Sequence, residues 1–196
     1  MCLLILRGGY RLSSRKPEKF RTLYLDPGED FGWCIGRDTK LLAAHTEKMW
    51  TVADGVWHAL NNPNDPNSYI NQAVLCREGV DPEENLGEIG RIVCEDWRLY
   101  PRTMKSLAWD QCRTARVIGA VTFMCRLKGV PLVLQGANIK KSGLAAGAEE
   151  LFYRPLHENR HQNDAIIHFS NFIAINLLDM PMQIIDTAPP LEDHDD

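Results

Sequence analysis

The chain contains 196 residues, which is enough for one domain with a substantial hydrophobic core. Hydrophobic residues make up 44% and charged residues 24%, the balance of a soluble globular protein, and no apolar run reaches the roughly 20 residues that a bilayer-spanning helix needs. The formal net charge is −4, and four carboxylates lie in the last six residues, so the composition excludes a strongly basic nucleic-acid-binding protein.

The first half of the chain predicts a flexible basic arm followed by a β-meander and a helix. Residues 1–20 are rich in Arg, Lys, Ser and Gly, and we expect the folded domain to span residues 21–180. The apolar runs 23–25 and 31–36 predict two strands around a Pro-Gly turn, which follows Asp26. A third strand over 40–46 and a helix over about 49–60 follow. Residues 61–85, with three prolines, are expected to form a loop insertion.

The second half alternates between strands and helices. Its expected elements are a strand over 89–95, a long helix over 104–125, a strand over 131–134, a loop or weak helix over 136–147 and a largely apolar helix over 164–178. Residues 181–196 form an acidic tail. The order of these elements predicts an α/β domain with a mixed β-sheet flanked by helices.

Four residues with metal-binding side chains stand at the ends of these elements. Asp26 and Glu95 each close a strand, whereas His161 and Asp164 lie one helical turn apart near the start of the last helix. An unpaired buried carboxylate is costly, and several that converge repel one another, so divalent ions such as Mg²⁺ or Mn²⁺ would stabilise the cluster. Two such ions ~4 Å apart can promote hydrolysis of a phosphodiester.

Each of these residues also has a simpler interpretation. Asp26 could cap the hairpin turn, and Asp164 could interact with the helix dipole. Strand alternation places Glu95 and Asp96 on opposite faces, so only one of them should enter the site. His161 could be a solvated loop residue, and its neighbours His157, Glu158 and Asn163 compete with it for the role of ligand.

Two basic groups are candidates for DNA binding. Lys105, Trp109, Arg113 and Arg116 follow one another at spacings of four, four and three residues, on the helix face away from the apolar stripe. Their side chains would neutralise phosphates, or they would form a solvated face with Trp109 in a dimer interface. Lys140 and Lys141 lie in the glycine-rich segment, either as phosphate contacts or in a plain exposed loop; this segment lacks the G-x-x-x-x-G-K-[ST] arrangement of a nucleotide-binding loop.

An ordered set of motifs resembles one known family. The segments that carry the resemblance are 23–28 (LYLDPG), 92–96 (IVCED), 115–120 (ARVIGA), 139–140 (IK) and 161–165 (HQNDA). Together they resemble the RuvC-type Holliday junction resolvases over residues 21–178. The resemblance implies an RNase H-like fold, a homodimer, and paired metal-dependent nicks in branched DNA at a four-way junction.

Carried over by position, the resemblance implies that Asp26, Glu95, His161 and Asp164 are the catalytic residues and hold Mg²⁺ or Mn²⁺, with two ions in each active site. The family inserts an apolar wedge into the junction just after the second acid. Here that position holds Arg98, with Trp97 and Tyr100 beside it, and all three are candidate DNA contacts. The insertion and the two tails indicate a divergent member of the family, which a phage could encode.

Other functions stay open. A broader branch or flap nuclease and an RNase H-like nuclease would use the same site, and a non-catalytic nucleic-acid-binding module could keep the fold. An ATP-binding sugar-kinase-like domain also begins with a hairpin, but the acidic Glu29 and Asp30 would repel phosphate.

The six scattered cysteines contain no C-x-x-C pair, which disfavours a zinc site or a disulfide framework. We expect a cytoplasmic protein with no membrane partner.

Overall fold

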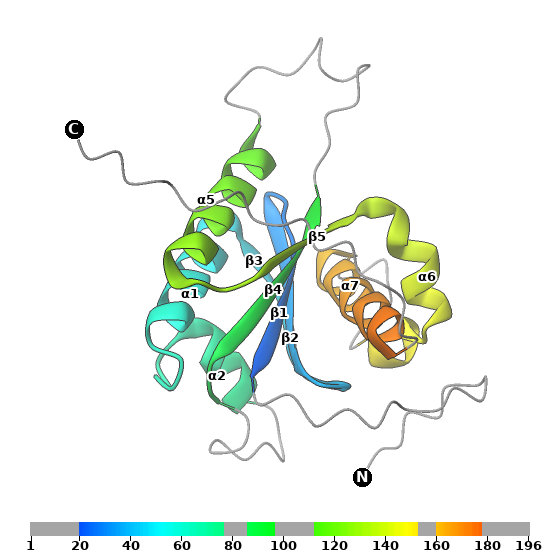
Figure 1. Cartoon of the computed structure of the whole chain (residues 1–196), viewed down its shortest axis with the longest axis horizontal. Coiled ribbons are helices and arrows are strands. Elements are labelled where there is room, and N and C mark those ends of the chain that lie inside the picture. The colour runs from blue at the N-terminus through cyan, green and yellow to red at the C-terminus, as the bar shows by residue number, and fades with distance from the viewer. Residues whose placement is uncertain (1–19, 77–85, 97–111, 153–159, 178–196) are drawn as a thin grey trace.

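The strands form one mixed sheet in the order β3-β2-β1-β4-β5. The computed structural model describes residues 20–76, 86–96, 112–152 and 160–177 (Figure 1). Strands β1, β2 and β3 form an antiparallel meander, and β4 and β5 run parallel to β1. The sheet consists of β1 (Arg21–Asp26), β2 (Asp30–Arg37), β3 (Lys40–Lys48), β4 (Ile89–Asp96) and β5 (Leu132–Gly136). This arrangement confirms the predicted mixed-sheet α/β fold.

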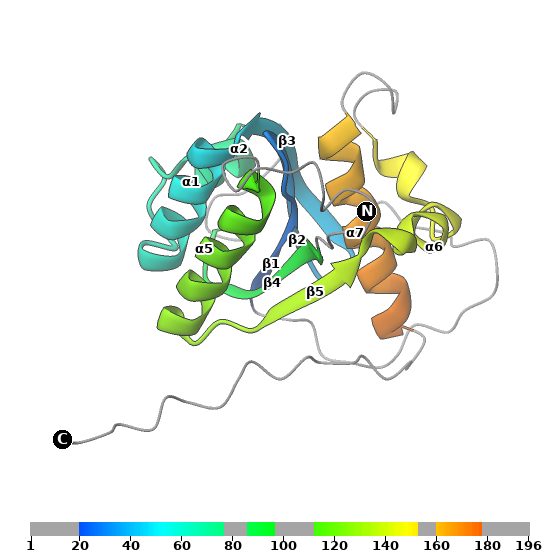
Figure 2. The ribbon, with the colours of Figure 1, turned by 90° about the horizontal axis from the view of Figure 1, so that it is seen from above.

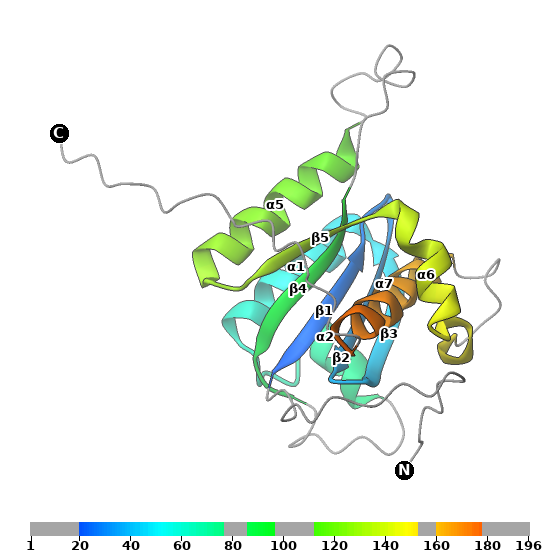
Figure 3. The same cartoon turned by 45° about the vertical axis from the view of Figure 1, so that its right-hand side comes forward.

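Helices cover both faces of the sheet, as Figure 2 shows. One face carries α1 (Met49–Asn61), α2 (Tyr69–Leu75) and α5 (Arg113–Lys128). The other face carries α6 (Lys140–Ala145) and α7 (Arg160–Leu177), with the short 3₁₀ helices η2 (Ala137–Ile139) and η3 (Ala148–Leu151) on either side of α6. Figure 3 shows α7 over β1 and β2, with α6 beside it.

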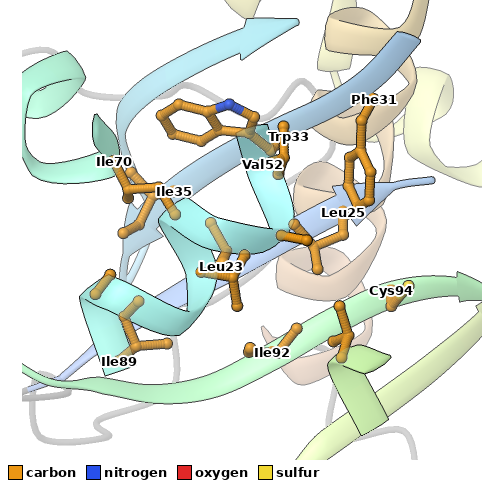
Figure 4. Packing of buried hydrophobic residues seen from close by; sticks show 14 of the residues in the cluster. Leu23, Leu25, Phe31, Trp33, Ile35, Val52, Ile70, Ile89, Ile92 and Cys94 are labelled. Carbon is orange, nitrogen blue, oxygen red and sulfur yellow. The ribbon is translucent and has the colours of Figure 1, made fainter. Parts of the chain in front are cut away.

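Strand alternation sorts the side chains between these two layers. Leu23 and Leu25 of β1 pack toward α1, together with Trp33 and Ile35 of β2 (Figure 4), whereas Tyr24 packs toward α7. Each such fully buried aliphatic side chain stabilises the fold by about 1.5–3 kcal/mol. Because side chains alternate along a strand, Asp26 faces α7 like Tyr24.

The segment 61–85 was predicted as a loop, and this prediction is wrong for residues 69–75, which form α2. Ile70 and Val74, one helical turn apart, bury their side chains in the core. The side chain of Asn71 accepts a 2.8 Å hydrogen bond from the buried guanidinium of Arg21. The prolines and asparagines before α2 dominated the sequence pattern and concealed this helical spacing.

The other predicted elements are found with shifted boundaries. Helix α7 begins at Arg160 rather than near 164, so both His161 and Asp164 lie inside it. The segment 136–147 contains the short helices η2 and α6. The predicted arm, the acidic tail and the first part of the helix predicted over 104–125 fall largely outside the described residues. No helix among the described residues is both long enough and apolar enough to span a bilayer.

Glycine allows α7 to approach the sheet closely. A Cβ atom on Gly32 of β2 would collide with the backbone carbonyl of His161. On the other side of α7, a Cβ atom on Gly143 of α6 would come within 2.5 Å of the carbonyl oxygen of Ile167. Any side chain at these two positions would push α7 away, so the two glycines fix where α7 lies between the sheet and α6.

Candidate metal centre

Asp26 and Glu95 lie side by side at the ends of two parallel strands. The register pairs Leu25 with Cys94, which brings the next residue of each strand to the same edge of the sheet. Both Asp26 and Glu95 face α7, because Cys94 packs into the core on the opposite face. Asp96 therefore faces away from α7, which resolves the ambiguity between the two adjacent acids in favour of Glu95.

Helix α7 places three polar side chains over this carboxylate pair. His161, Asp164 and His168 follow one another at spacings of three and four residues, and so share one face of the helix. His161 Nδ1 lies 2.8 Å from Asp26 Oδ2, and His168 Nε2 lies 3.1 Å from Glu95 Oε2. The structure thus brings the four predicted ligands together and adds His168 to them.

Asp164 is buried and carries two basic neighbours. Lys140, the first residue of α6, places its Nζ 2.6 Å from Asp164 Oδ2, and Arg160 Nε lies 3.7 Å from the same oxygen. The sequence predicted Lys140 either as a phosphate contact or as part of a plain exposed loop. The structure places it in a helix and pairs it with an acid of the centre, where it offsets negative charge.

His168 is the residue that the sequence analysis missed. It is 1% exposed, and its Nδ1 lies 2.8 Å from Oε1 of Gln135, a buried residue of β5. The carboxylates of Asp26 and Glu95 and the His168 ring each offer one ligand atom, all within 4.8 Å of one another. The tight group includes neither His161, which contacts Asp26, nor Asp164, whose charge acts on Asp26.

The two strand-end carboxylates compete for a proton. Burial raises the pKa of Asp26 to about 6, with further contributions from the negative charges of Glu95 and Asp164, although the bond to His161 opposes this. Burial alone would also raise the pKa of Glu95, but hydrogen bonds from His168 and Asp26 outweigh it and lower that pKa. Of the two carboxyls, Asp26 is therefore the one that retains a proton at lower pH. The bond to Asp26 in turn raises the pKa of His161.

The donor set fits a divalent cation. Two carboxylates that share a proton in a buried place offer a position where a cation can replace that proton. Carboxylate oxygens suit Mg²⁺ and Mn²⁺, and an imidazole nitrogen shifts the preference toward the softer Mn²⁺. Ligands on opposite sides of such an ion lie roughly 4 Å apart, so the 4.8 Å group needs only a small contraction to bind one.

The remaining predicted DNA contacts fall in two classes. Arg113, Arg116 and Lys141 lie on the surface, and Arg113 Nη1 lies 3.2 Å from Oε1 of Glu29. The predicted contacts Trp97, Arg98, Tyr100 and Lys105 fall outside the described residues, and so does Trp109. The competing ligands His157 and Glu158 also fall outside, and Asn163 is buried on α7.

Two solved structures of RuvC from Thermus thermophilus are similar to this one. A structure titled "T. thermophilus RuvC in complex with Holliday junction substrate" matches 82% of this chain and 98% of its own, with 13% identity and a TM-score of 0.52. The chain has a RuvC-like fold. The Thermus thermophilus RuvC structure without a named substrate matches 81% of this chain and 98% of its own, at 16% identity and a TM-score of 0.41. No protein-family model and no curated protein sequence matches the chain.

This likeness agrees with the architecture described above. A mixed five-stranded sheet with helices on both faces is the RNase H-like fold of RuvC. The resemblance that the sequence motifs indicated is therefore confirmed at the level of the fold.

Proposed function

We propose that the chain is a metal-dependent, structure-selective DNA endonuclease that resolves four-way junctions by paired hydrolysis of phosphodiesters. The observation that carries the proposal is the meeting of Asp26, Glu95 and three α7 side chains at one edge of a RuvC-like sheet. The RuvC structure with the higher TM-score is a complex with a Holliday junction substrate. Motifs, fold and donor set thus point to the same chemistry.

In this proposal Asp26, Glu95 and His168 hold one Mg²⁺ or Mn²⁺ ion, and Asp164 and His161 complete the site for that ion or a second one. Bound ions would activate water and stabilise the leaving oxygen of the phosphodiester. Before an ion binds, Asp26 must give up its proton, and His161, 2.8 Å away, can accept it and release it to solvent, because only a neutral imidazole can act as a ligand. Lys140 next to Asp164 is placed to offset charge that develops on the phosphate.

Paired cutting requires two copies of the site. A four-way junction has approximate two-fold symmetry, and the described part of the chain contains one candidate metal centre, so we propose a C2 homodimer.

Labelled four-way, three-way, flap and linear DNA, each with Mg²⁺ or Mn²⁺, test the proposal directly. The wild-type chain should cut the four-way junction at symmetric positions, and Asp26→Asn should bind it without cutting. Equal cutting of flaps and junctions would favour the broader branch nuclease. Binding without cutting by the wild-type chain would favour a non-catalytic module, and native mass measures the number of copies.

A further inference from the structure

A second surface feature lies on the opposite side of the β1–β2 turn from the metal centre. It is a pocket of about 190 Å³. Its walls come from the turn, from the junction between β3 and α1, and from the start of α5, through Glu29, Lys48, Met49, Trp50, Arg113 and Arg116. We call it the Trp50 pocket. None of its residues belongs to the metal centre.

The turn connects the pocket with the metal centre. Asp26 precedes the turn, and a Cβ atom on Gly28 would lie 3.4 Å from Cε1 of His161. The next residue, Glu29, lines the pocket, and its carbonyl oxygen accepts a 3.3 Å hydrogen bond from the backbone N–H of Met49. A strand of DNA bound at the metal centre would need to pass only this short turn to reach the pocket.

The pocket presents an aromatic ring beside positive charges. Trp50 is 53% exposed although it is the largest apolar side chain there. The guanidinium of Arg116 forms no ion pair in the part of the chain that the structure describes, whereas Arg113 pairs with Glu29 and Lys48 with Asp30. An exposed ring and an uncompensated guanidinium together suit a nucleotide, because a base stacks on the ring while Arg contacts phosphate.

The size of the pocket limits the kind of ligand. A pocket that encloses a free small molecule commonly has a volume of about 300–1,000 Å³, and this one is smaller. It can take one flat ring system that remains attached to a longer molecule in solvent. At a branch point in DNA, bases are unpaired or weakly stacked, so moving one into a pocket costs less than in a regular duplex.

We infer that the Trp50 pocket binds one unstacked nucleotide of the branched DNA substrate, with the base on the Trp50 ring and the adjoining phosphate at Arg116. This inference rests on the proposed function and adds a second contact point next to the metal centre. It leaves the chemistry of cleavage unchanged and concerns where the branch point is held.

Photocrosslinking tests the contact itself. The full chain carrying Asp26→Asn would be bound to four-way junctions with 5-iodouracil at successive positions around the branch point. Irradiation should join one of these positions to Trp50, identified by mass spectrometry of the crosslinked peptide. Crosslinks only to residues outside the pocket would overturn the inference.

Affinity measurements in the same Asp26→Asn background provide a matched comparison. Trp50→Ala should weaken binding to the junction about tenfold, and Trp50→Phe should retain most of the affinity because a ring remains. Trp57→Ala is the control: Trp57 lies on the same helix, is also exposed, and stacks with Lys128 outside the pocket. Equal affinities of Trp50→Ala and Trp57→Ala, with unfolding temperatures like that of the parent chain, would remove the pocket from DNA binding.

Two further outcomes separate this inference from the proposed function. A folded wild-type chain that neither binds nor cuts any branched DNA contradicts both. A wild-type chain that cuts junctions normally, while Trp50→Ala cuts and binds equally well, contradicts the pocket alone. A free mononucleotide should not displace the junction; displacement at low concentration would identify the pocket as a site for a small ligand instead.

Discussion

Below about pH 6, Asp26 retains a proton in the metal-free chain because burial and the charge of Glu95 both disfavour its ionised form. Its folded-state pKa of about 6 exceeds the ordinary 3.8, so the folded chain binds this proton more tightly than the unfolded chain does. Stability from this group is therefore fully present below about pH 4 and is lost as pH rises through 6. Above that pH the ionised carboxylate destabilises the fold by about 1–3 kcal/mol.

Asp26→Asn should accordingly stabilise the metal-free chain while abolishing cleavage. At pH 8 without metal we expect the unfolding temperature to rise by about 2–6 °C, and at pH 4 to change little. Thermal unfolding in a chelator at both pH values measures this. Asp30→Asn is the control, because Lys48 lowers the pKa of that exposed carboxyl, so its removal should bring no gain. A loss of stability in Asp26→Asn at pH 8 would contradict the proton-sharing account.

Metal binding should stabilise the chain more at high pH than at low pH. The cation competes with the proton on Asp26 and with protonation of His161, whose pKa is raised by its bond to Asp26. We expect the rise in unfolding temperature on adding Mn²⁺ to be large at pH 8 and small at pH 5. Asp26→Asn should lose most of the rise. An effect of Mn²⁺ that is independent of pH, or unchanged in Asp26→Asn, would place the ion elsewhere.

His168 and Gln135 offer a test of how Glu95 is held in position. Gln135 contacts the His168 ring, and the ring contacts Glu95 through its other nitrogen. Replacing Gln135 by Met keeps the volume but removes the partner of Nδ1, so Mn²⁺ affinity and cleavage rate should each fall about 10–100-fold. His168→Ala should cost more and lower stability by about 1–3 kcal/mol, because Glu95 loses a buried partner. Titration with Mn²⁺ separates the loss of ion affinity from misfolding. Full Mn²⁺ affinity in both variants would exclude a role of Gln135 and His168 in holding Glu95 in position.

At the scale of elements, the sequence predicted the strands that present Asp26 and Glu95, because each apolar run ends at an acid. It could not predict His168, because no local pattern marks this histidine among the buried residues of α7, and its burial depends on Gln135 from a distant strand. The sequence could not predict the contact of Lys140 with Asp164 either, since this contact depends on how α6 packs against α7. Local patterns predict the elements, but long-range partners decide which polar groups enter the centre.

The close approach of α7 to β2 provides a prediction at this scale. In Gly32→Ala the added methyl group would meet the His161 backbone, so α7 must move or the strand must bend. We expect a loss of about 1–3 kcal/mol of stability and a marked fall in cleavage, because His161 moves away from Asp26. Gly119→Ala in α5 is the matched control: its Cβ meets nothing within 4 Å, and it should gain up to about 1 kcal/mol. Urea unfolding compares the two; a neutral Gly32→Ala would show that α7 can shift freely.

For the molecule as a whole, the sheet separates two candidate sites. The face under α7 carries the candidate metal centre, and the face under α1 and α5 carries the Trp50 pocket, with the β1–β2 turn between them. The net charge of −4 gives no general attraction to DNA. Binding of DNA would then depend on a few basic side chains and on the metal ions at one edge of the sheet.

The proposed homodimer makes a prediction that belongs to the whole assembly. A plasmid that extrudes a four-way junction is linearised only if both strands are cut within one binding event. A mixture of equal amounts of wild-type and Asp26→Asn chains, allowed to exchange subunits, should contain about half of its dimers with a single active site. These dimers should produce nicked circles, so the ratio of nicked to linear product should rise sharply over that of wild type alone. Gel analysis of early time points measures the ratio, and a ratio equal to that of wild type diluted with buffer would mean that each chain cuts independently.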